Sequence, residues 1–345
     1  MASAAADQMS EAVAVVVVTY QSRDVLPSLA ESVLPQLRED DTLVVVDNCS
    51  PDGTATLAKA IGERVIVIAN ESNAGFAAAC RQGVEATSAS LILLLNPDAR
   101  LEPGALDRLR ETASERPDWA VWQAAVMLPD GRINTSGGVV HYLGIGWAGR
   151  CGRSASELPA EPYETAFASG AAMMVRRSAW DELDGFDDSY FLYCEDLDLG
   201  LRAWLAGRRV GVEPRARVVH RYDFDKGARK WYLLERNRWR TVLADYPTPL
   251  LILVLPALLA SELALLAVAA RGGWLRAKLR AQAATLTAMP AVLRRRARVQ
   301  RSRAVSAREF SAALTASLES ATVDLPVVFA RIQQGYWYLV SKLLR

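Results

Sequence analysis

Residues 12–96 alternate short apolar runs with segments of helical spacing, and this alternation constrains the fold more than any other feature of the chain. The apolar runs read AVAVVVVTY, TLVVVDN, VIVIAN and LILLLN. Because each run is apolar on both faces, the strands that it predicts need cover on both sides of a sheet. We therefore expect an α/β fold, a mostly parallel sheet with helices on both faces, continuing to about residue 246.

The pattern changes twice after the fourth run. Residues 128–166 are rich in Gly, Pro and Ser, which predicts a mobile loop near a site rather than a packed layer. A strand at 173–175 and a helix over 195–207 restore the regular pattern. Residues 250–270 then form an apolar run of 21 residues, long enough to span a bilayer, and an amphipathic helix over 326–345 ends the chain.

Charge is distributed unevenly along the chain. Residues 271–308 carry 11 Arg or Lys and no acid, and since the net charge is +1, the rest must carry about −10 (1 − 11). Such a cationic segment favours contact with a polyanion. The four cysteines lie far apart without a Cys-x-x-Cys pair, which favours a reducing compartment over a disulfide framework or a zinc site. Residues 1–11 are expected to be disordered, without the features of a signal peptide.

Polar residues directly follow all four apolar runs. They are Thr19-Tyr20, Asp47-Asn48, Asn70 to Asn73, and Asn96-Pro97-Asp98. Any one of these could be an ordinary turn. Four at the ends of four parallel strands favour a ligand site, and Asp47 could accept the ring N–H of a pyrimidine. No Gly-x-Gly-x-x-Gly follows the first run and no Gly-Lys-Ser/Thr occurs, which disfavours a dinucleotide dehydrogenase and a P-loop ATPase.

Candidate metal ligands and a candidate base follow from position. Asn96 and Asp98 lie two apart on an extended chain, so both can face one hard cation; the alternative is a plain Asn-Pro-Asp turn. Glu195 and Asp196 begin the predicted helix, where one could be a general base or both could simply favour the helix dipole. Helical spacing does not choose between the two acids. His220 ends the run ARVVH and could complete a metal site or be an ordinary histidine.

Six segments together resemble the family 2 inverting glycosyltransferases of the GT-A fold, and most closely their bacterial rhamnosyltransferase-like members. The segments are VVVVTYQS, VVVDNCSPDGT, NESNAGFAAACRQG, LLLNPDA, ASGAAMMVRR and DGFDDSYFLYCEDLDLGLR. They lie in the family's order between residue 13 and about residue 222. The resemblance implies a Rossmann-like nucleotide-diphospho-sugar transferase domain over 12–246. The apolar run, the basic stretch and the last helix predict a C-terminal helical, membrane-associating region over 247–345.

The resemblance assigns roles residue by residue. Contacts to the nucleotide sugar fall on Thr19, Tyr20, Asp47, Asn73, Gly75, Phe76, Asn96, Asp98, Gly170 and Ala171. Mg²⁺ or Mn²⁺ is expected on Asp98, Asn96 and His220, with Asp98 the stronger ligand. Asp196 becomes the expected base, beside Glu195. The donor is expected to be dTDP-rhamnose or a UDP-sugar, and the acceptor a lipid-linked glycan of the cell envelope.

The C-terminal region predicts where the protein acts. A plain span over 250–270 would separate the basic stretch from the catalytic domain, and Pro256 and Glu262 also argue against it. We expect a re-entrant or in-plane helix, with cations such as Arg294–Arg296 on the anionic cytoplasmic face of the cell membrane. The alternative is a buried helix in a soluble domain or a homodimer interface.

Two other functions compete with the enzyme. One is a catalytically inactive nucleotide-sugar-binding scaffold at the membrane, which leaves the retained Asp98, Asp196 and His220 unexplained. The other is a polyanion-binding protein acting through its arginines, which leaves the strand-end acids unexplained. Nucleic acid is not an expected partner.

Overall fold

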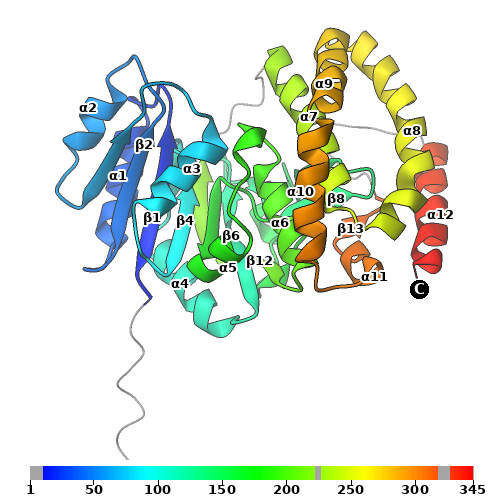
Figure 1. Ribbon diagram of the computed structural model, residues 1–345. Coiled ribbons are helices and arrows are strands. Elements are labelled where there is room, and N and C mark those ends of the chain that lie inside the picture. Colours follow the sequence, from blue (N-terminus) through cyan, green and yellow to red (C-terminus); the bar gives the residue numbers. More distant parts are fainter. Residues whose placement is uncertain (1–10, 222–226, 318–326, 345) are drawn as a thin grey trace, which may run out of the picture.

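The computed structural model describes residues 11–221, 227–317 and 327–344 (Figure 1). The N-terminus predicted to be disordered lies outside these residues except for Glu11. Ten strands form one sheet, ordered β10-β12-β6-β11-β4-β1-β2-β3 with β5 and β7 paired at its side. These strands are β1 (Val13–Thr19), β2 (Thr42–Asp47), β3 (Val65–Ala69), β4 (Leu91–Leu95), β5 (Ala99–Leu101), β6 (Trp119–Met127), β7 (Ile133–Thr135), β10 (Tyr163–Glu164), β11 (Ala172–Arg176) and β12 (Arg209–His220).

The mostly parallel sheet predicted from the four apolar runs is confirmed. Strand β1 pairs in parallel with β2 and β4, and β2 pairs in parallel with β3. Strand β11 runs antiparallel between β4 and β6, so the sheet becomes mixed beyond the fourth run. The third run is less covered than the pattern predicts, because β3 is at the edge of the sheet and Ile66 is 39% exposed.

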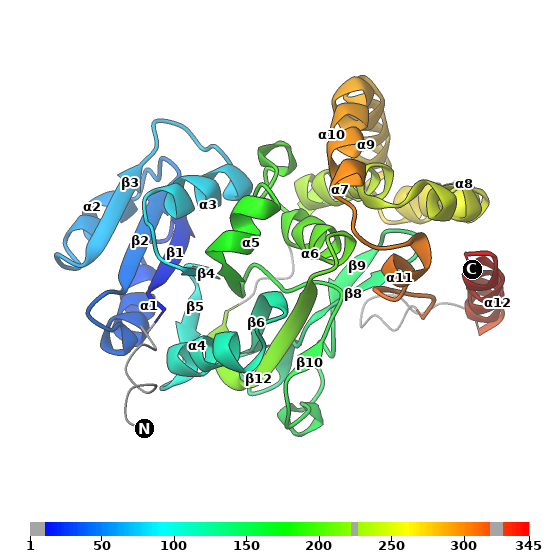
Figure 2. The ribbon, with the colours of Figure 1, turned by 60° about the horizontal axis from the view of Figure 1, so that its bottom comes forward.

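Helices cover both faces of the sheet because β1 is apolar on both sides (Figure 2). Val13, Val15 and Val17 face one core, which includes side chains of α1 and α4. Ala14, Val16 and Val18 face the other core, which includes side chains of α3 and α6. The helices in this part of the chain are α1 (Leu26–Val33), α2 (Thr54–Lys59), α3 (Phe76–Glu85), α4 (Ala105–Glu115), α5 (Arg177–Glu182) and α6 (Glu195–Leu205).

The glycine-rich segment 128–166 is not the mobile loop that its composition predicts. Strands β8 (Gly138–His141) and β9 (Gly146–Ala148) form a second sheet with β13 (Leu314–Thr315). The glycines permit close packing. A Cβ on Gly138 would lie 2.2 Å from the Phe167 ring, and one on Gly146 would lie 2.2 Å from the Leu197 side chain. The prediction from composition is wrong because glycine here permits close packing against neighbouring side chains as well as turns.

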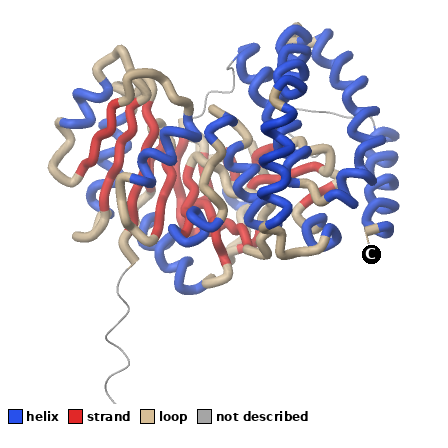
Figure 3. Tube along the Cα trace, viewed as in Figure 1, coloured by secondary structure: helices blue, strands red, loops and turns tan. Residues whose placement is uncertain are grey.

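Six further helices gather at one end of the sheet (Figures 1 and 3). They are α7 (Gly227–Asp245), α8 (Thr248–Arg271), α9 (Leu275–Thr287), α10 (Met289–Arg301), α11 (Ala307–Ser311) and α12 (Val327–Leu343). Helix α8 contains the apolar run, and its Leu250, Val254 and Leu258 belong to the same core as α3 and α6. The helices therefore pack on the sheet domain through shared apolar side chains.

The basic stretch does not face outward as a whole. Arg295 is buried, with Nε 2.7 Å from Asp187 and Nη1 3.2 Å from Asp245, and it also contacts Asp198. Arg296 donates to the carbonyl oxygens of Leu243 and Tyr246. The expectation that Arg294–Arg296 rest on lipid headgroups is thus wrong for two of the three residues. Buried carboxylates need cationic partners, and Arg295 meets that need, whereas Arg296 is held by backbone carbonyl oxygens.

Lys278 shows the same behaviour in helix α9. It is fully buried, and its Nζ lies 2.6 Å from Glu235 and 2.9 Å from Glu262. Arg238 of α7 also pairs with both acids. Glu262, which interrupts the apolar run in the sequence, therefore points into the protein and joins α8 to α7 and α9.

Candidate active site

The candidate site lies at the carboxyl ends of β1, β2 and β4, which meet at one edge of the sheet. Thr19 stands opposite Asp47, and Val17 stands opposite Leu95. The residues that follow each strand are therefore neighbours. This register brings together predicted residues that are nearly 80 positions apart in the sequence, from Thr19 to Asn96.

Asp47 has a carboxylate fixed by its surroundings. Thr19 Oγ1 donates to Asp47 Oδ1 at 2.8 Å, and Ser50 donates to both carboxylate oxygens, at 2.9 Å from its backbone and 2.6 Å from its hydroxyl. Asp47 is only 2% exposed, whereas Tyr20 is 51% exposed. The strand end thus offers an oriented acceptor beside an open aromatic side chain, which is the arrangement expected for holding a base.

Gly75 brings the start of helix α3 against the segment before α6. Its φ is +89°, and a Cβ at this position would lie 2.6 Å from the Phe191 ring. Asn73 accepts the Gly75 N–H at 2.9 Å, and the Phe76 N–H donates to the Phe191 carbonyl at 2.6 Å. Side chains larger than glycine are excluded by both conformation and space.

Gly170 and Ala171 connect the two halves of the site. The Gly170 N–H donates to Asp196 Oδ2 at 3.1 Å, and a Cβ on Gly170 would lie 3.4 Å from the Phe76 ring. The Ala171 carbonyl accepts the Asn96 N–H at 3.1 Å. A continuous series of contacts therefore runs from Asn96 through Ala171 and Gly170 to Phe76 and Asp196.

The predicted metal ligands converge although 122 positions separate Asp98 from His220. His220 Nε2 lies 3.0 Å from Asp98 Oδ1 and 3.2 Å from Asn96 Nδ2. Among the described residues no three His, Cys, Asp or Glu form a metal cluster, so this set combines two such residues with an amide. Carboxylate and amide oxygens are ligands of Mg²⁺ and Mn²⁺, and an imidazole nitrogen is one that a transition metal such as Mn²⁺ accepts, so the residues fit the predicted ion.

Asn134 is a site residue that sequence reasoning missed. Its Oδ1 lies 3.0 Å from His220 Nδ1, on the side of the ring away from Asp98. In the tautomer that donates from Nδ1 to Asn134, the ring directs the lone pair of Nε2 toward Asp98. Such a partner fixes the orientation of a metal-binding histidine. No local pattern marks Asn134, because it lies in the segment predicted to be a loop.

The two adjacent acids of helix α6 face different surroundings. Glu195 is buried, and its Oε2 has no hydrogen-bond partner among the described residues. Burial, and then the nearby Asp196, raise the pKa of Glu195 well above its usual value. Asp196 is half-buried, and burial also raises its pKa, although the N–H groups of Gly170 and Leu197 oppose the rise.

This geometry separates the two candidate bases that helical spacing left equivalent. Asp196 contacts Gly170, beside Phe76 and the end of β4, whereas Glu195 is enclosed. A carboxylate with a raised pKa binds a proton more readily, as a general base requires. The position of Asp196 favours it over Glu195.

A groove of about 980 Å³ lies elsewhere on the protein. It is lined by β8, β9, β10 and the end of α6, including Trp147, Tyr163 and Trp204, and by none of the predicted site residues. The faces of Tyr163 and Trp204 are covered by the guanidinium groups of Arg150 and Arg209, with 5.0 Å between each group and its ring centre. The groove is therefore not part of the candidate site.

Comparisons with known proteins agree with the family resemblance found in the sequence. The sequence model described as glycosyl transferase family 2 matches residues 14–184. The chain is 28% identical over 246 residues to an N-acetylglucosaminyl-diphospho-decaprenol L-rhamnosyltransferase of Mycobacterium tuberculosis, covering 61% of this chain and 76% of that protein. It is 27% identical over 248 residues to the O-antigen biosynthesis protein RfbC of Myxococcus xanthus, covering 67% of this chain and 19% of that protein.

A solved structure shows the same fold. The crystal structure of GalNAc-T7 with UDP, GalNAc and Mn²⁺ matches with a TM-score of 0.59 and 16% identity. The match covers 70% of this chain but 49% of that chain, so this chain spans about half of its length. The GT-A fold expected from the sequence is thereby confirmed.

Proposed function

Since this chain belongs to the family 2 glycosyltransferases, we propose that it transfers a sugar, with inversion, from a nucleotide diphosphate to a lipid-linked glycan in cell-envelope polysaccharide synthesis. The names of two similar proteins support this class, one a rhamnosyltransferase acting on a decaprenol-linked sugar and one a protein of O-antigen synthesis. We expect dTDP-rhamnose as the donor, with a UDP-sugar second.

The donor is proposed to bind across the strand ends. Asp47, held by Thr19 and Ser50, accepts an N–H of the base, and Tyr20 packs beside it. Asp98, Asn96 and His220 would hold Mg²⁺ or Mn²⁺, and a bound ion would supply positive charge for the leaving diphosphate. Asn134 keeps the His220 ring in place.

The acceptor hydroxyl is proposed to lose its proton to Asp196. The hydroxyl oxygen attacks the anomeric carbon while the bond from that carbon to the diphosphate oxygen breaks on the opposite face. A hydroxyl is a poor nucleophile at neutral pH, so the carboxylate takes the proton as the new bond forms. The observation that carries this proposal is the contact of Asp196 with Gly170, which also borders Phe76 and is joined through Ala171 to Asn96.

The enzymatic proposal is tested with a panel of nucleotide sugars. Purified protein should release a nucleoside diphosphate from one donor, and EDTA should abolish the release until Mn²⁺ or Mg²⁺ is restored. Binding of a nucleotide sugar without any turnover on lipid-linked acceptors would instead support the inactive scaffold.

The metal assignment has its own test. Asp98→Ala should weaken metal-dependent nucleotide binding in calorimetry by at least roughly tenfold. Lys59→Ala, on exposed helix α2 outside the site, is the matched control. Equal affinities of wild type and Asp98→Ala with and without metal would rule the assignment out.

We further propose that the protein lies on the cytoplasmic face of the cell membrane through helices α8 and α12. Helix α8 is long and apolar enough to cross a membrane by length and composition. One side of it is buried at Leu250, Val254, Leu258, Ser261, Glu262 and Ala269, which supports an in-plane position over a span. The outward faces are apolar, with exposed Ile252, Leu255, Leu259, Leu263 and Val268 on α8 and Ile332, Leu339 and Leu343 on α12.

Cations outside the buried network are the ones proposed to meet anionic lipid. Arg271, Arg276 and Arg280 are exposed where α8 turns into α9. Changing Arg276 and Arg280 to Ser should weaken binding to phosphatidylglycerol vesicles by about 1 kcal/mol per residue, and should not affect binding to phosphatidylcholine vesicles. Equal binding of both proteins to anionic vesicles would refute the role of these arginines.

Topology is tested with single cysteines at Ala228 and Ala304 in a background without the native four. An in-plane helix α8 keeps both positions on the cytoplasmic side, so an impermeant thiol reagent should label them only after cells are opened. Labelling of position 304 but not of position 228 in intact cells would show that α8 spans the membrane.

A further inference from the structure

The segment that leads into helix α6 has an unusual backbone. Phe191, Tyr193 and Cys194 have φ values of +65°, +69° and +67°. At Phe191 ψ is −58°, and the Leu192 N–H donates to the Tyr190 carbonyl at 2.7 Å, which makes a γ-turn of the rare, strained form. Three residues other than glycine in this region within four positions need a compensating force from the surroundings.

Asn237 of helix α7 supplies that force. Its Nδ2 lies 3.0 Å from the Tyr190 carbonyl, 3.0 Å from the Leu192 carbonyl and 2.7 Å from the Tyr193 carbonyl. The side chain is fully buried, so water does not substitute for it. One amide group thus gathers three carbonyl oxygens that the positive φ angles turn to the same side.

Arg236 fixes the orientation of that amide. Its Nε donates to Asn237 Oδ1 at 2.9 Å, so Nδ2 faces the carbonyls. Arg236 Nη2 also donates to the Ser189 and Tyr190 carbonyls, at 3.0 and 2.7 Å. Helix α7 therefore holds the segment through neighbouring side chains with different tasks.

The held segment touches both halves of the candidate site. The Phe191 carbonyl accepts the N–H groups of Phe76 and Ala77 at the start of α3, and the Phe191 ring occupies the space beside Gly75. Cys194 is the residue that precedes helix α6, whose first two residues are the candidate bases. Movement of this segment would displace the acids relative to Gly170 and Phe76.

We propose that Asn237 is a positioning residue for sugar transfer, holding residues 190–194 in the conformation that sets the first turn of α6. The inference rests on the proposed function, because it assigns the acids of that turn to the reaction. Asn237 does not touch the reacting atoms in this role and acts through the backbone that it binds.

Glycine distinguishes this role from a general contribution to folding. Glycine adopts positive φ without steric cost, so a glycine at position 194 removes part of the strain that Asn237 opposes. The effect of Asn237→Ala should then be smaller in a Cys194→Gly background than in the wild type, and the difference measures the coupling of the two positions. A contribution to folding alone would lower the unfolding free energy without lowering the kcat of the folded protein.

The experiment measures turnover of the full-length protein on the donor found with the nucleotide-sugar panel. Asn237→Ala should lower kcat by roughly a hundredfold, the loss expected when a catalytic group moves by about 1 Å. In Cys194→Gly protein the same change should cost at most about tenfold. The control is Arg150→Gly, which relieves a positive φ of +55° elsewhere and should not rescue Asn237→Ala.

A second measurement does not depend on activity. The Cys194 thiol is partly buried, so Asn237→Ala should increase its modification by a thiol reagent, measured by mass spectrometry against Cys151 in the same sample. If Asn237→Ala does not fold, Asn237→Ser, which keeps one donor, is compared in both backgrounds.

Equal losses of kcat in the two backgrounds, or no loss in either, would overturn the role of Asn237. This result is separable from the choice of base. If glycine rescues Asn237→Ala while Asp196→Asn stays active, the assignment of Asp196 fails and that of Asn237 stands.

Discussion

Two aspartates on helix α6, Asp196 and Asp198, are two residues apart and have pKa values shifted in opposite directions. Burial raises the pKa of Asp196, which accepts only backbone N–H groups, from Gly170 and Leu197. Burial also opposes ionisation of Asp198, but Arg202 and Arg295 outweigh it and lower the pKa of Asp198 to about 2. Among the described residues, Asp196 thus has no cationic partner, whereas Asp198 has two, Arg202 and Arg295.

The difference shows that burial alone does not determine the charge of a carboxylate in this protein. A cation within hydrogen-bond distance decides it. Asp245 shows the limit of this rule, because it shares Arg295 with the ionised Asp198, and burial followed by that negative charge raises the pKa of Asp245 well above its usual range. We infer that Asp196 is available for proton transfer, whereas Asp198 attaches α6 to α10 through Arg295.

The largest expected effect is on catalysis, from Asp196→Asn. If Asp196 accepts the proton in the reaction, turnover should fall by roughly 10²–10⁴. Nucleotide binding should change little, because Asp196 is not among the strand-end residues that hold the donor. The check is kcat with calorimetric nucleotide affinity on the same preparation, with Glu195→Gln measured beside it.

A folded Asp196→Asn protein with near-normal turnover would end the assignment of the base. Asp196 and Asp198 would then differ in pKa without the proposed difference in function.

On the side of α6 that carries Asp198, we expect Arg295→Met to destabilise the fold. It removes the cation shared by three carboxylates, and breaking such a buried cluster costs about 3–5 kcal/mol. Arg294→Met is the matched control, since Arg294 is the exposed neighbour on the same helix. Urea unfolding measures both. Equal stability of the two variants would show that the cluster contributes nothing net.

A fall in pH should change the contributions of Asp198 and Asp196 to the unfolding free energy in opposite directions. The folded pKa of Asp198, about 2, is below its ordinary value of 3.8, so the stabilisation is complete above pH 3.8 and is lost as the pH falls toward 2. The shift corresponds to roughly 2 kcal/mol. Asp196 has a raised pKa, so its contribution is present below pH 3.8 and is lost as the pH rises through the folded value.

Urea unfolding measured from neutral pH down to about pH 2 tests this prediction. Asp198→Asn should flatten the acid limb of the stability curve, whereas Asp196→Asn should leave that limb in place and should not destabilise the protein at neutral pH. The same acid limb in wild type and Asp198→Asn would contradict the role of the two arginines.

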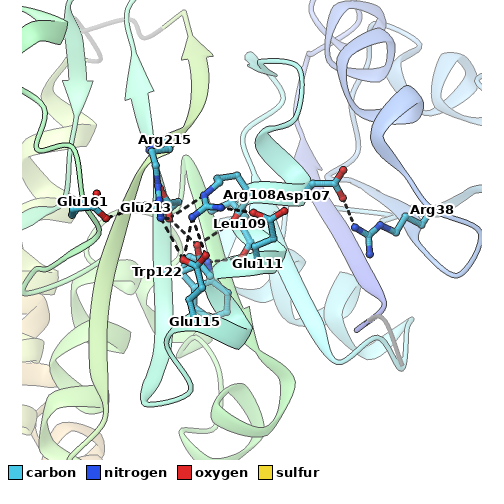
Figure 4. A network of polar contacts seen from close by, with 11 residues as sticks. Arg38, Asp107, Arg108, Leu109, Glu111, Glu115, Trp122, Glu161, Glu213 and Arg215 are labelled. Carbon is cyan, nitrogen blue, oxygen red and sulfur yellow. Dashed lines mark hydrogen bonds and ion pairs between the residues drawn. The ribbon is translucent and has the colours of Figure 1, made fainter. Parts of the chain in front are cut away.

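The smallest effect is expected at the exposed edge of a polar network around α4 and β12, on the other face of the sheet (Figure 4). There Arg38 and Asp107 form an ion pair of 2.7 Å with side chains 45% and 51% exposed. Asp107→Ala should change the unfolding free energy by about 0–1 kcal/mol, because water screens the pair. A loss as large as that of Arg295→Met would mean that burial does not separate the two networks.

Much of the fold and of the site was predictable from the sequence because the evidence is local. The four apolar runs determined the parallel strands, and the polar residues after them predict where ligands would bind. Asn96 and Asp98 are two apart, and Glu195 and Asp196 begin a helix, so their candidate roles depended only on spacing. Charge was less informative, because a count of arginines in 271–308 does not say which of them meet acids.

Tertiary structure alone decided what depends on distant partners. It brought His220 to Asp98 and Asn134 to His220, and it separated Asp196 from Glu195 by contact with Gly170. It also turned Arg295 inward and placed the amide of Asn237 on the carbonyls before α6. The sequence determines which groups a chain carries, but their pKa values, partners and orientations depend on distances that exist only after folding.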